Sequence, residues 1–360
     1  MTMTGFFRLV VPVALLLDIM NVSAAVAATD FTLQTLSPGV HAVMRTEPLG
    51  LANHANTVFI INDSDVVVVD TQFTLAATRE VVAALKKLTD KPVSYLVNTH
   101  WHDDHTFGNQ VWKEAYPGLE IISHERTRSD MATTAVENRQ QQVDGGPEAI
   151  ARFEGAVTAG KALDGSTMSP EELAAYESTI KLARTYVAEV PGFTLTLPTI
   201  TFSDRMVLQR GGRTIEIRHL GDGVTRGDAV VWLPAEKILV AGDLVNDPFP
   251  FTYGGHVTGW VASLEAIRAL APSIIVPGHG PVQRDMALVD RLTAAFSTLR
   301  TQAQADRTNG TSEEDFLKSV ALGSQQATMV GDNKMLAFLF RSYFVGPAAT
   351  SAYRGDDTGR

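Results

Sequence analysis

The stretch Thr99-His100-Trp101-His102-Asp103-Asp104-His105 gathers three of the chain's nine histidines and two aspartates within seven residues. A packed core does not tolerate imidazole and carboxylate groups at this density unless they have partners. These groups are, however, the nitrogen and oxygen ligands that borderline cations such as zinc prefer. The run therefore favours a metal site and a metal-dependent hydrolase, and the alternative is a solvated polar loop.

The segments before this run place it at the end of a strand. Residues 57–70 contain two β-branched runs around a turn at 62–65, which predicts a hairpin whose second strand ends at Asp70. Apolar residues recur at helical spacing over 75–90, and a buried strand follows at 93–98. Because α/β-type sheets hold their sites at the carboxyl ends of strands, this order predicts a site at the histidine run.

A helix-rich segment interrupts the later strands. Residues 125–190 are rich in Ala, Glu, Gln and Arg, and Gly145-Gly146-Pro147 and Ser169-Pro170-Glu171-Glu172 punctuate them. Ser169 followed by Glu172 is a capping box, which predicts the start of a helix. We expect two or three helices inserted between sheet strands, as ordinary scaffold or as a lid over the substrate. Further strands are predicted at 119–124, 193–195, 200–202, 206–208, 214–218, 229–233, 237–240 and 274–276, with a hairpin turn at Gly211-Gly212.

Two more candidate ligands follow apolar strands. Asp243 comes directly after Gly242, and His279 lies between Gly278 and Gly280. A glycine beside a ligand lets the backbone approach closely without a Cβ clash. Either residue alone is more often a cap or a hydrogen-bonded structural residue, so their significance depends on the whole set.

The composition restricts the classes of function. The chain is 45% hydrophobic and 19% charged, which is enough for a large core, and its formal net charge is −10. A nucleic-acid binder that relies on phosphate contacts is usually basic, so we expect a small-molecule substrate and no nucleic acid. The chain has no cysteine, so any metal must take nitrogen and oxygen ligands.

The N-terminus is typical of a secretory signal. Arg8 precedes an apolar stretch at 9–17, and Ala25-Val26-Ala27 is a small-x-small cleavage site. We therefore expect residues 1–27 to be removed, a periplasmic or secreted protein, and no stable membrane insertion afterwards. The alternative is a retained membrane anchor, although the apolar stretch is short for a bilayer.

The order His-x-His-x-Asp-His, then Gly-Asp, then Pro-Gly-His-Gly resembles that of the metallo-β-lactamase fold hydrolases, from about Leu36 to Val282. The resemblance implies an α+β fold, an αβ/βα sandwich of two mixed β-sheets flanked by helices. It implies a single domain over 28–360, with a helical insertion at about 125–190 and a helical tail at about 282–345. One such scaffold carries lactamases, lactonases, thioesterases and phosphodiesterases, so the motifs do not choose a substrate.

The resemblance also implies a role for each motif residue. Two zinc ions would activate a water molecule to cleave an ester, lactone, amide or phosphoester bond. Asp243 would bridge both ions, Asp104 would also relay a proton as a catalytic residue, and Asp70 would orient a ligand imidazole or simply cap its strand. The other implied ligands are His100 and His102 for the first zinc, and Asp104, His105 and His279 for the second.

One position departs from the family pattern. Family members usually have a third first-site histidine in a Gly-x-x-His-Thr-x-Gly-Asp stretch, and residues 221–228 here carry Val224 at that place. Valine cannot bind a metal, so the first site should be weaker, or completed by water or by another side chain. His124 and His256 are the candidates, and His219 is expected to point elsewhere. We therefore predict one tightly and one loosely held metal.

Three further interpretations stay open. An iron-dependent redox member of the same fold would use a similar ligand set. A metal-binding protein without catalysis would explain Val224. The aromatic loop at 246–259, followed by Trp260, either contacts the substrate or only packs.

Overall fold

The computed structural model describes residues 30–48, 50 and 52–355, so the expected signal peptide lies outside the described residues. Its strands are β1 (Phe31–Ser37), β2 (Val40–Arg45), β3 (Thr57–Ile61), β4 (Val66–Val69), β5 (Val93–Val97), β6 (Glu120–His124), β7 (Ile200–Phe202), β8 (Arg205–Arg210), β9 (Arg213–Arg218), β10 (Val230–Leu233), β11 (Ile238–Gly242) and β12 (Ile274–Pro277). Its helices are α1 (Leu75–Leu88), α2 (Asp103–Thr106), α3 (Asn109–Ala115), α4 (Glu125–Ala132), α5 (Thr134–Ala159), α6 (Pro170–Glu189), η1 (Val190–Gly192), α7 (Val257–Leu270), α8 (Ala287–Thr308), α9 (Glu313–Ser319), α10 (Gly323–Val330), α11 (Lys334–Leu339), η2 (Phe340–Val345) and α12 (Gly346–Arg354).

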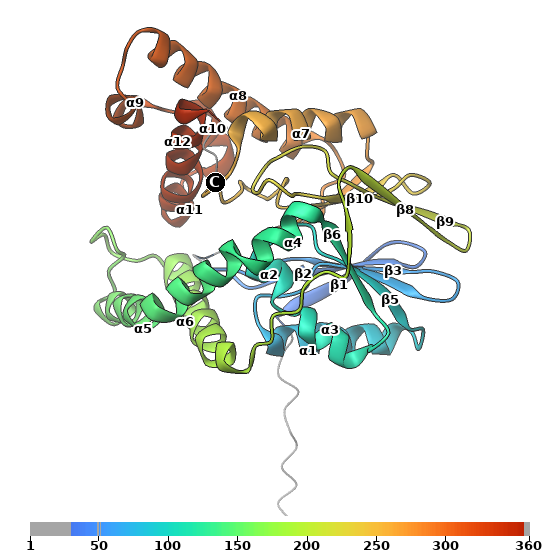
Figure 1. Ribbon diagram of the computed structural model, residues 1–360. Coiled ribbons are helices and arrows are strands. Elements are labelled where there is room, and N and C mark those ends of the chain that lie inside the picture. The colour runs from blue at the N-terminus through green and yellow to red at the C-terminus, as the bar shows by residue number, and fades with distance from the viewer. Residues whose placement is uncertain (1–29, 49, 51, 356–360) are drawn as a thin grey trace, which may run out of the picture.

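The strands form two mixed sheets, as predicted (Figure 1). The first has seven strands in the order β1-β2-β3-β4-β5-β6-β7, and the second has five in the order β12-β11-β10-β9-β8. One apolar core lies between the sheets, where Val58 and Val69 of the first belong to the same cluster as Ile217 and Val240 of the second. Burying both apolar sheet faces in this way stabilises the sandwich.

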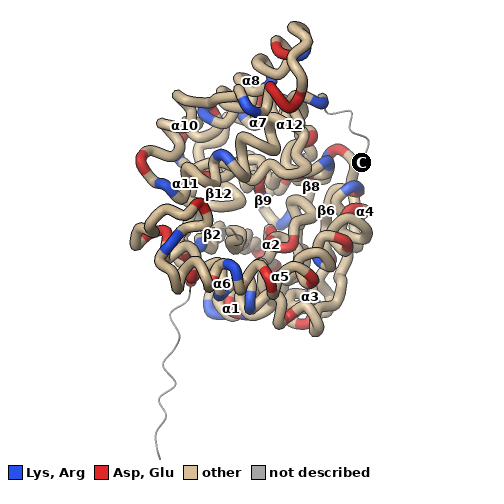
Figure 2. Tube along the Cα trace, turned by 90° about the vertical axis from the view of Figure 1, so that its left-hand side faces the viewer, with Lys and Arg blue, Asp and Glu red and all other residues tan. Residues whose placement is uncertain are grey.

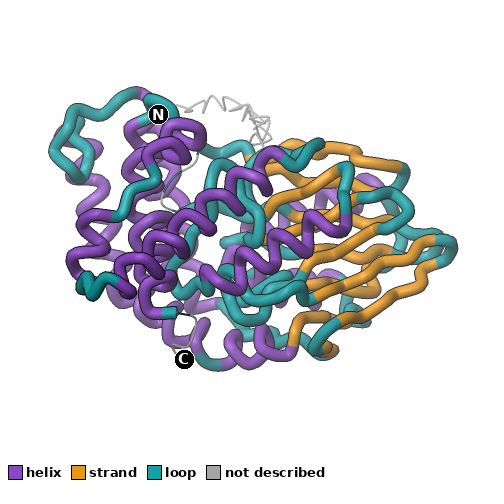
Figure 3. The backbone as a smooth tube through the Cα atoms, turned by 90° about the horizontal axis from the view of Figure 1, so that it is seen from above, coloured by secondary structure: helices purple, strands orange, loops and turns teal. Residues whose placement is uncertain are grey.

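Helices cover the outer faces of both sheets. α1 and α3 pack on the first sheet through a cluster that includes Leu85 and Trp112. α7, α8 and the C-terminal helices pack on the second sheet around Trp260 and Phe296. Figure 3 shows the strands at one end of the molecule and a helix-rich region at the other. No helix within the described residues is long and apolar enough to cross a membrane.

Parallel strands bring the candidate site together. β4, β5, β6 and β7 are parallel neighbours in the first sheet, and β11 and β12 are parallel in the second. Their carboxyl ends therefore lie along one edge of each sheet. Asp70 follows β4, the histidine run follows β5, Asp243 follows β11 and His279 follows β12. The topology thus delivers four segments that are distant in sequence to one place.

The segment expected to be helical contains three helices, α4, α5 and α6. Ser169 and Glu172 form the predicted capping box at the start of α6. The expectation that Gly145-Gly146-Pro147 interrupts the helices was wrong, because α5 continues through Pro147. Gly146 lies where α5 approaches α6, since a Cβ there would come within 2.9 Å of Val187. This glycine serves close helix packing rather than a turn.

The strand predicted at 193–195 was also wrong, because these residues form a loop between η1 and β7. Phe193 stacks on Phe107, with ring centroids 4.4 Å apart, and the backbone N–H of Thr194 donates to Gln110 rather than to a neighbouring strand. Contacts with side chains, and not hydrogen bonds to a neighbouring strand, therefore hold residues 193–195 in place. The strands β1 and β2 and the helices α3 and α7 were not predicted, and the C-terminal helices continue beyond residue 345 to Arg354.

Candidate metal centre

The centre begins at the end of β5, where the chain turns into the short helix α2. Asp70 receives hydrogen bonds from the backbone N–H of Thr99 (2.8 Å) and from its hydroxyl (2.7 Å). The same carboxylate accepts from Nδ1 of His105 at 2.8 Å. This contact leaves Nε2 of His105 facing the centre and fixes the orientation of its ring. Asp70 thus lies beside the cluster, as expected.

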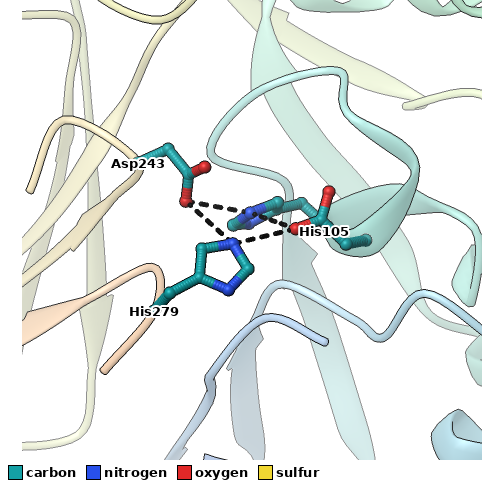
Figure 4. Close-up of side chains that lie close together, drawn as sticks. His105, Asp243 and His279 are labelled. Carbon is teal, nitrogen blue, oxygen red and sulfur yellow. Dashed lines mark ion pairs between the residues drawn. The ribbon is translucent and has the colours of Figure 1, made fainter. Parts of the chain in front are cut away.

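Four side-chain atoms enclose a small space (Figure 4). Nε2 of His105 lies 3.2 Å from Oδ2 of Asp104 and 3.1 Å from Oδ1 of Asp243. Nε2 of His279 lies 3.0 Å and 3.5 Å from the same two oxygens. The residues come from three separate segments of the chain. We name these four residues the tight cluster.

The dimensions of the tight cluster suit a metal ion. Bonds of about 2.05 Å to zinc in tetrahedral geometry separate neighbouring ligand atoms by about 3.3 Å. Nε2 of His105 and Oδ1 of Asp243 are buried and make no hydrogen bond, although they lie close together. Buried polar atoms without a partner are rare, because leaving them unpaired costs free energy. Both atoms therefore have the geometry of ligands that share a cation.

A second, wider cluster adjoins the first. It comprises His100, His102 and Asp243, with Nε2 of His100 lying 3.9 Å from Oδ2 of Asp243. Nε2 of His100 is also buried without a hydrogen-bond partner, while its Nδ1 contacts the Thr99 hydroxyl at 3.2 Å. Asp243 thus presents one oxygen to each cluster, which is the arrangement that a bridging carboxylate requires. The structure therefore brings together all six residues predicted as ligands.

The charges of the tight cluster are mutually dependent. Burial alone would raise the pKa of Asp104, but His105 and His279 hold that pKa well below its usual range. Burial likewise opposes the charged form of His105, but Asp104, Asp243 and Asp70 hold the pKa of this imidazole well above its usual range. In contrast, burial holds the pKa of His100 well below its usual range, and the neighbouring histidines His105 and His102 lower it as well. The Asp104 and Asp243 carboxylates therefore stay ionised, which is the form in which a carboxylate binds a cation.

Glycines permit the close approach of these segments. A Cβ at Gly278 would lie 1.9 Å from Oδ1 of Asp243, so no other residue fits against this carboxylate. Gly242 has φ +52°, and its Cβ would meet the Thr99 hydroxyl at 2.6 Å. The loop after β12 is held by Asn246, whose side-chain oxygen accepts from the His279 N–H at 2.9 Å.

No other histidine in the described residues joins either cluster in place of Val224. Val224 is 1% exposed and belongs to the apolar core under the second sheet. His124 is excluded as a replacement because Nε2 contacts the Ser203 carbonyl at 2.9 Å and Nδ1 accepts from the Arg126 N–H. His219 points elsewhere, as expected, with Nδ1 on the Asp228 carbonyl at 2.7 Å. His256 precedes α7 and lies outside both clusters.

A buried ion pair that was not predicted from the sequence connects the ligand loop to the inserted helices. Asp103 lies between His102 and Asp104, and Arg139 of α5 binds its carboxylate through Nε at 3.1 Å and through Nη2. Tyr186 of α6 donates to the same carboxylate at 2.5 Å. Burial and the nearby Asp103 charge raise the pKa of Tyr186, so its hydroxyl keeps its proton. No local pattern marks these residues, because their partners are 36 and 83 positions away.

A cavity of about 390 Å³ opens over the tight cluster. Asp104, Asp243 and His279 line it, together with part of the loop at 246–259. Phe249 and Phe251 of this loop line the cavity, whereas Trp260 is fully buried and donates its indole N–H to the Leu244 carbonyl. The aromatic residues of this region therefore have two different roles: Phe249 and Phe251 form part of the cavity wall, and Trp260 packs in the core.

The structure thus places two joined His/Asp clusters, which could hold metal ions, at the ends of parallel strands in a two-sheet sandwich. A family profile described as metallo-beta-lactamase superfamily matches residues 51–279. The chain therefore belongs to the metallo-β-lactamase superfamily. The resemblance inferred from the motifs is confirmed.

Similar proteins differ widely in what their names say they act on. A linear primary-alkylsulfatase from Pseudomonas sp. is 26% identical over 222 residues, which cover 59% of this chain and 39% of that protein. A type 2 metallo-beta-lactamase from Bacteroides fragilis is 34% identical over 92 residues, covering 24% and 37% of the two chains. The chain thus spans well under two thirds of these relatives. A metallo-beta-lactamase structure from Pontibacter korlensis superposes with a TM-score of 0.50 at 20% identity, over 74% of this chain and 99% of that one, which shows the shared fold.

Proposed function

We propose that the protein is an exported zinc-dependent hydrolase that cleaves an ester, lactone, amide or phosphoester bond in a small molecule. The observation that supports this most strongly is the tight cluster, whose four ligand atoms stand 3.0–3.5 Å from their neighbours and include two unpartnered buried atoms. Zinc, when bound, would supply a water molecule with a pKa of about 7 and a positive charge for the developing oxyanion. The residues that would hold two ions are His100, His102, Asp104, His105, Asp243 and His279.

Asp104 is the proposed catalytic residue. Its carboxylate lines the cavity, and Nε2 of His105 and Nε2 of His279 both contact its Oδ2. An oxygen in this position can accept a proton from the attacking water and return it to the leaving group. His105 cannot turn away during this transfer, because Asp70 holds the other nitrogen of its ring.

We further propose that residues 28–360 form a single domain of an exported protein, periplasmic or secreted. The apolar stretch and cleavage site within residues 1–27 support this localisation. The net charge of −10 supports a partner other than nucleic acid. In Figure 2 the basic residues are interspersed with acidic ones, which agrees with a small-molecule substrate.

Metal removal tests this proposal. Zinc-loaded protein should hydrolyse at least one of p-nitrophenyl butyrate, nitrocefin and bis-p-nitrophenyl phosphate, and 1,10-phenanthroline should reduce the rate by about 100-fold or more, because several kcal/mol of charge stabilisation is lost. Added zinc should restore the rate. Elemental analysis of protein as purified distinguishes zinc from iron. A protein that retains no metal, or whose activity ignores the chelator, contradicts the proposal.

The departure at Val224 predicts unequal metal affinities. The tight cluster offers four ligands, whereas the wider cluster offers three and shares Asp243. After dialysis against a weak chelator, we expect about one zinc per chain to remain, because a missing ligand lowers affinity. The measurement is atomic emission analysis during a timed dialysis. Two ions lost at the same rate would contradict the prediction.

A further inference from the structure

The cavity over the metal centre has an unusual charge balance. Among the described residues, no lysine or arginine lines it. Its charged groups outside the proposed ligands are Asp103, which Arg139 neutralises, and Asp247, which pairs with Arg291 at 3.9 Å from outside the cavity lining. Its remaining polar groups are the Trp101 indole N–H, the Tyr343 hydroxyl and several amides, among them those of Asn138 and Gln142 of α5. A substrate with an anionic group away from the metals would therefore find no cation here.

Cations do line a second cavity, which shares Trp101 with the first. Arg226 there is paired with Asp130, and Arg354 is paired with Glu313 at 2.8 Å. Carboxylates therefore balance these two charges, and the third cation of this cavity, Arg341, lines the second cavity and not the first. They do not compensate for the absence of a cation beside the tight cluster.

The rest of the cavity wall is apolar and begins at the metal centre itself. The Phe251 ring lies 6.2 Å from the His102 ring and 5.5 Å from the Tyr343 ring. Leu339 of α11 and Phe73 complete this surface. If the carbonyl group of a substrate lay at the tight cluster, the substituent of that carbonyl group would contact aromatic and aliphatic side chains. The area suits an apolar chain, whose burial there is favourable.

From these observations we propose that the substrate is an uncharged carboxylic ester or lactone whose apolar chain lies against Phe251, Tyr343 and Leu339. This inference rests on the proposed hydrolase function. The oxygen of water forms a bond to the carbonyl carbon, the acyl carbon–oxygen bond breaks, and the leaving oxygen receives a proton. The products are an alcohol, a carboxylate and one proton released to the solvent, and a lactone gives a single hydroxy carboxylate and the same proton. Because the carboxylate product is anionic, the absence of a cation among the described residues that line the cavity favours its release.

A matched pair of substrates tests the charge preference. p-Nitrophenyl hexanoate and mono-p-nitrophenyl adipate share the leaving group and a six-carbon acyl chain, but the second ends in a carboxylate. We expect the neutral ester to have at least about 30-fold higher kcat/KM, mainly through KM. Rates for neutral p-nitrophenyl esters should also rise by up to about fourfold per added methylene until the cavity is filled.

A cation placed in the cavity should change this preference. Gln142 is an exposed residue of α5 that lines the cavity, whereas its neighbour Gln141 is exposed but does not line it. Gln142→Arg should raise kcat/KM for the adipate ester about tenfold relative to the hexanoate ester. The matched control Gln141→Arg adds the same charge to the same helix and should leave the ratio unchanged. Equal responses of the two variants would overturn the inference.

Dye binding gives a reading that does not depend on turnover. N-phenyl-1-naphthylamine is neutral, and 1-anilinonaphthalene-8-sulfonate is a related dye that carries a sulfonate. Chelator-treated protein should bind the neutral dye in competition with 1-octanol, and Phe251→Ala should weaken that binding about fivefold or more. The sulfonate should gain affinity in Gln142→Arg but not in Gln141→Arg. A preference of the unmodified protein for the sulfonate would overturn the inference.

The outcomes separate this inference from the proposed function. Chelator-sensitive cleavage of nitrocefin or of a phosphoester, with little cleavage of the hexanoate ester, would overturn the substrate class and leave the metal-dependent hydrolase in place. A lack of metal-dependent cleavage of every substrate would overturn both. Preference for the neutral ester together with the Gln142→Arg switch would support both.

Discussion

Replacing Asp243 by asparagine is expected to lower kcat/KM by about 10³-fold and to release both metals during purification. Asp243 presents Oδ1 to His105 and His279 and Oδ2 to His100, whereas asparagine has a single amide oxygen and an N–H₂ group. Several kcal/mol of charge stabilisation would be lost, at about 1.36 kcal/mol for each tenfold change in rate. Steady-state kinetics and elemental analysis of the same preparation provide the measurement.

The control for this substitution is Asp332→Asn, which makes the same chemical change at an exposed turn. It should retain both metals and full activity. Chelator-treated Asp243→Asn protein should unfold at or above the temperature of chelator-treated unmodified protein, because a buried charge has been removed. An active variant with two bound metals would contradict the bridging role. A variant that is unstable even without metal would show a structural role instead.

Removing the Arg139 guanidinium is expected to lower the free energy of unfolding by about 3–5 kcal/mol, because Arg139→Leu leaves the Asp103 carboxylate buried without its cation. Asp103 lies between two proposed ligands, so metal affinity should also fall by about 10- to 100-fold. Chemical denaturation measures the first effect, and competition with a chromogenic chelator measures the second. The inserted helices α5 and α6 would then stabilise the ligand loop as well as cover it.

Two further variants test whether the buried contacts of Asp103 cause the expected loss of stability. Tyr186→Phe keeps the ring stacked on Phe73 but removes the hydrogen bond to Asp103, so it should cost about 1.5–3 kcal/mol. Arg184→Ala breaks an exposed ion pair with Glu154 between the same two helices and should cost about 1 kcal/mol or less. If Arg184→Ala and Arg139→Leu have equal effects, the buried pair does not have the role assigned to it.

Much of the fold could be predicted because the relevant patterns are local. Alternation and β-branched runs identified most strands, since a strand of four to six residues carries its own signal. The errors occurred where tertiary contacts overrode the local pattern. Phe193 stacks on Phe107 instead of forming the predicted strand. Gly146 is helical, and α6 packs closely against it. The capping box at Ser169 was predicted correctly, because both of its partners lie within four residues.

The ligand candidates could also be read from the chain, because each follows an apolar strand directly and because parallel strands end at a common edge. The sequence could not show their separations, nor that Asp243 turns one oxygen toward each cluster. It also could not show that the space near Val224 remains without a substitute histidine in the described residues.

What the sequence by itself determined is the inventory: six imidazole and carboxylate side chains, the strands that carry them, and the absence of thiol ligands. The tertiary structure alone decided the pairing of Asp103 with Arg139 and Tyr186. It also decided the cavity formed by α5, α11 and the loop before α7, which no lysine or arginine of the described residues lines. The physical reason is the distance along the chain over which each effect acts. Propensity and strand periodicity act over a few residues, whereas charge neutralisation and cavity shape depend on which distant surfaces pack together.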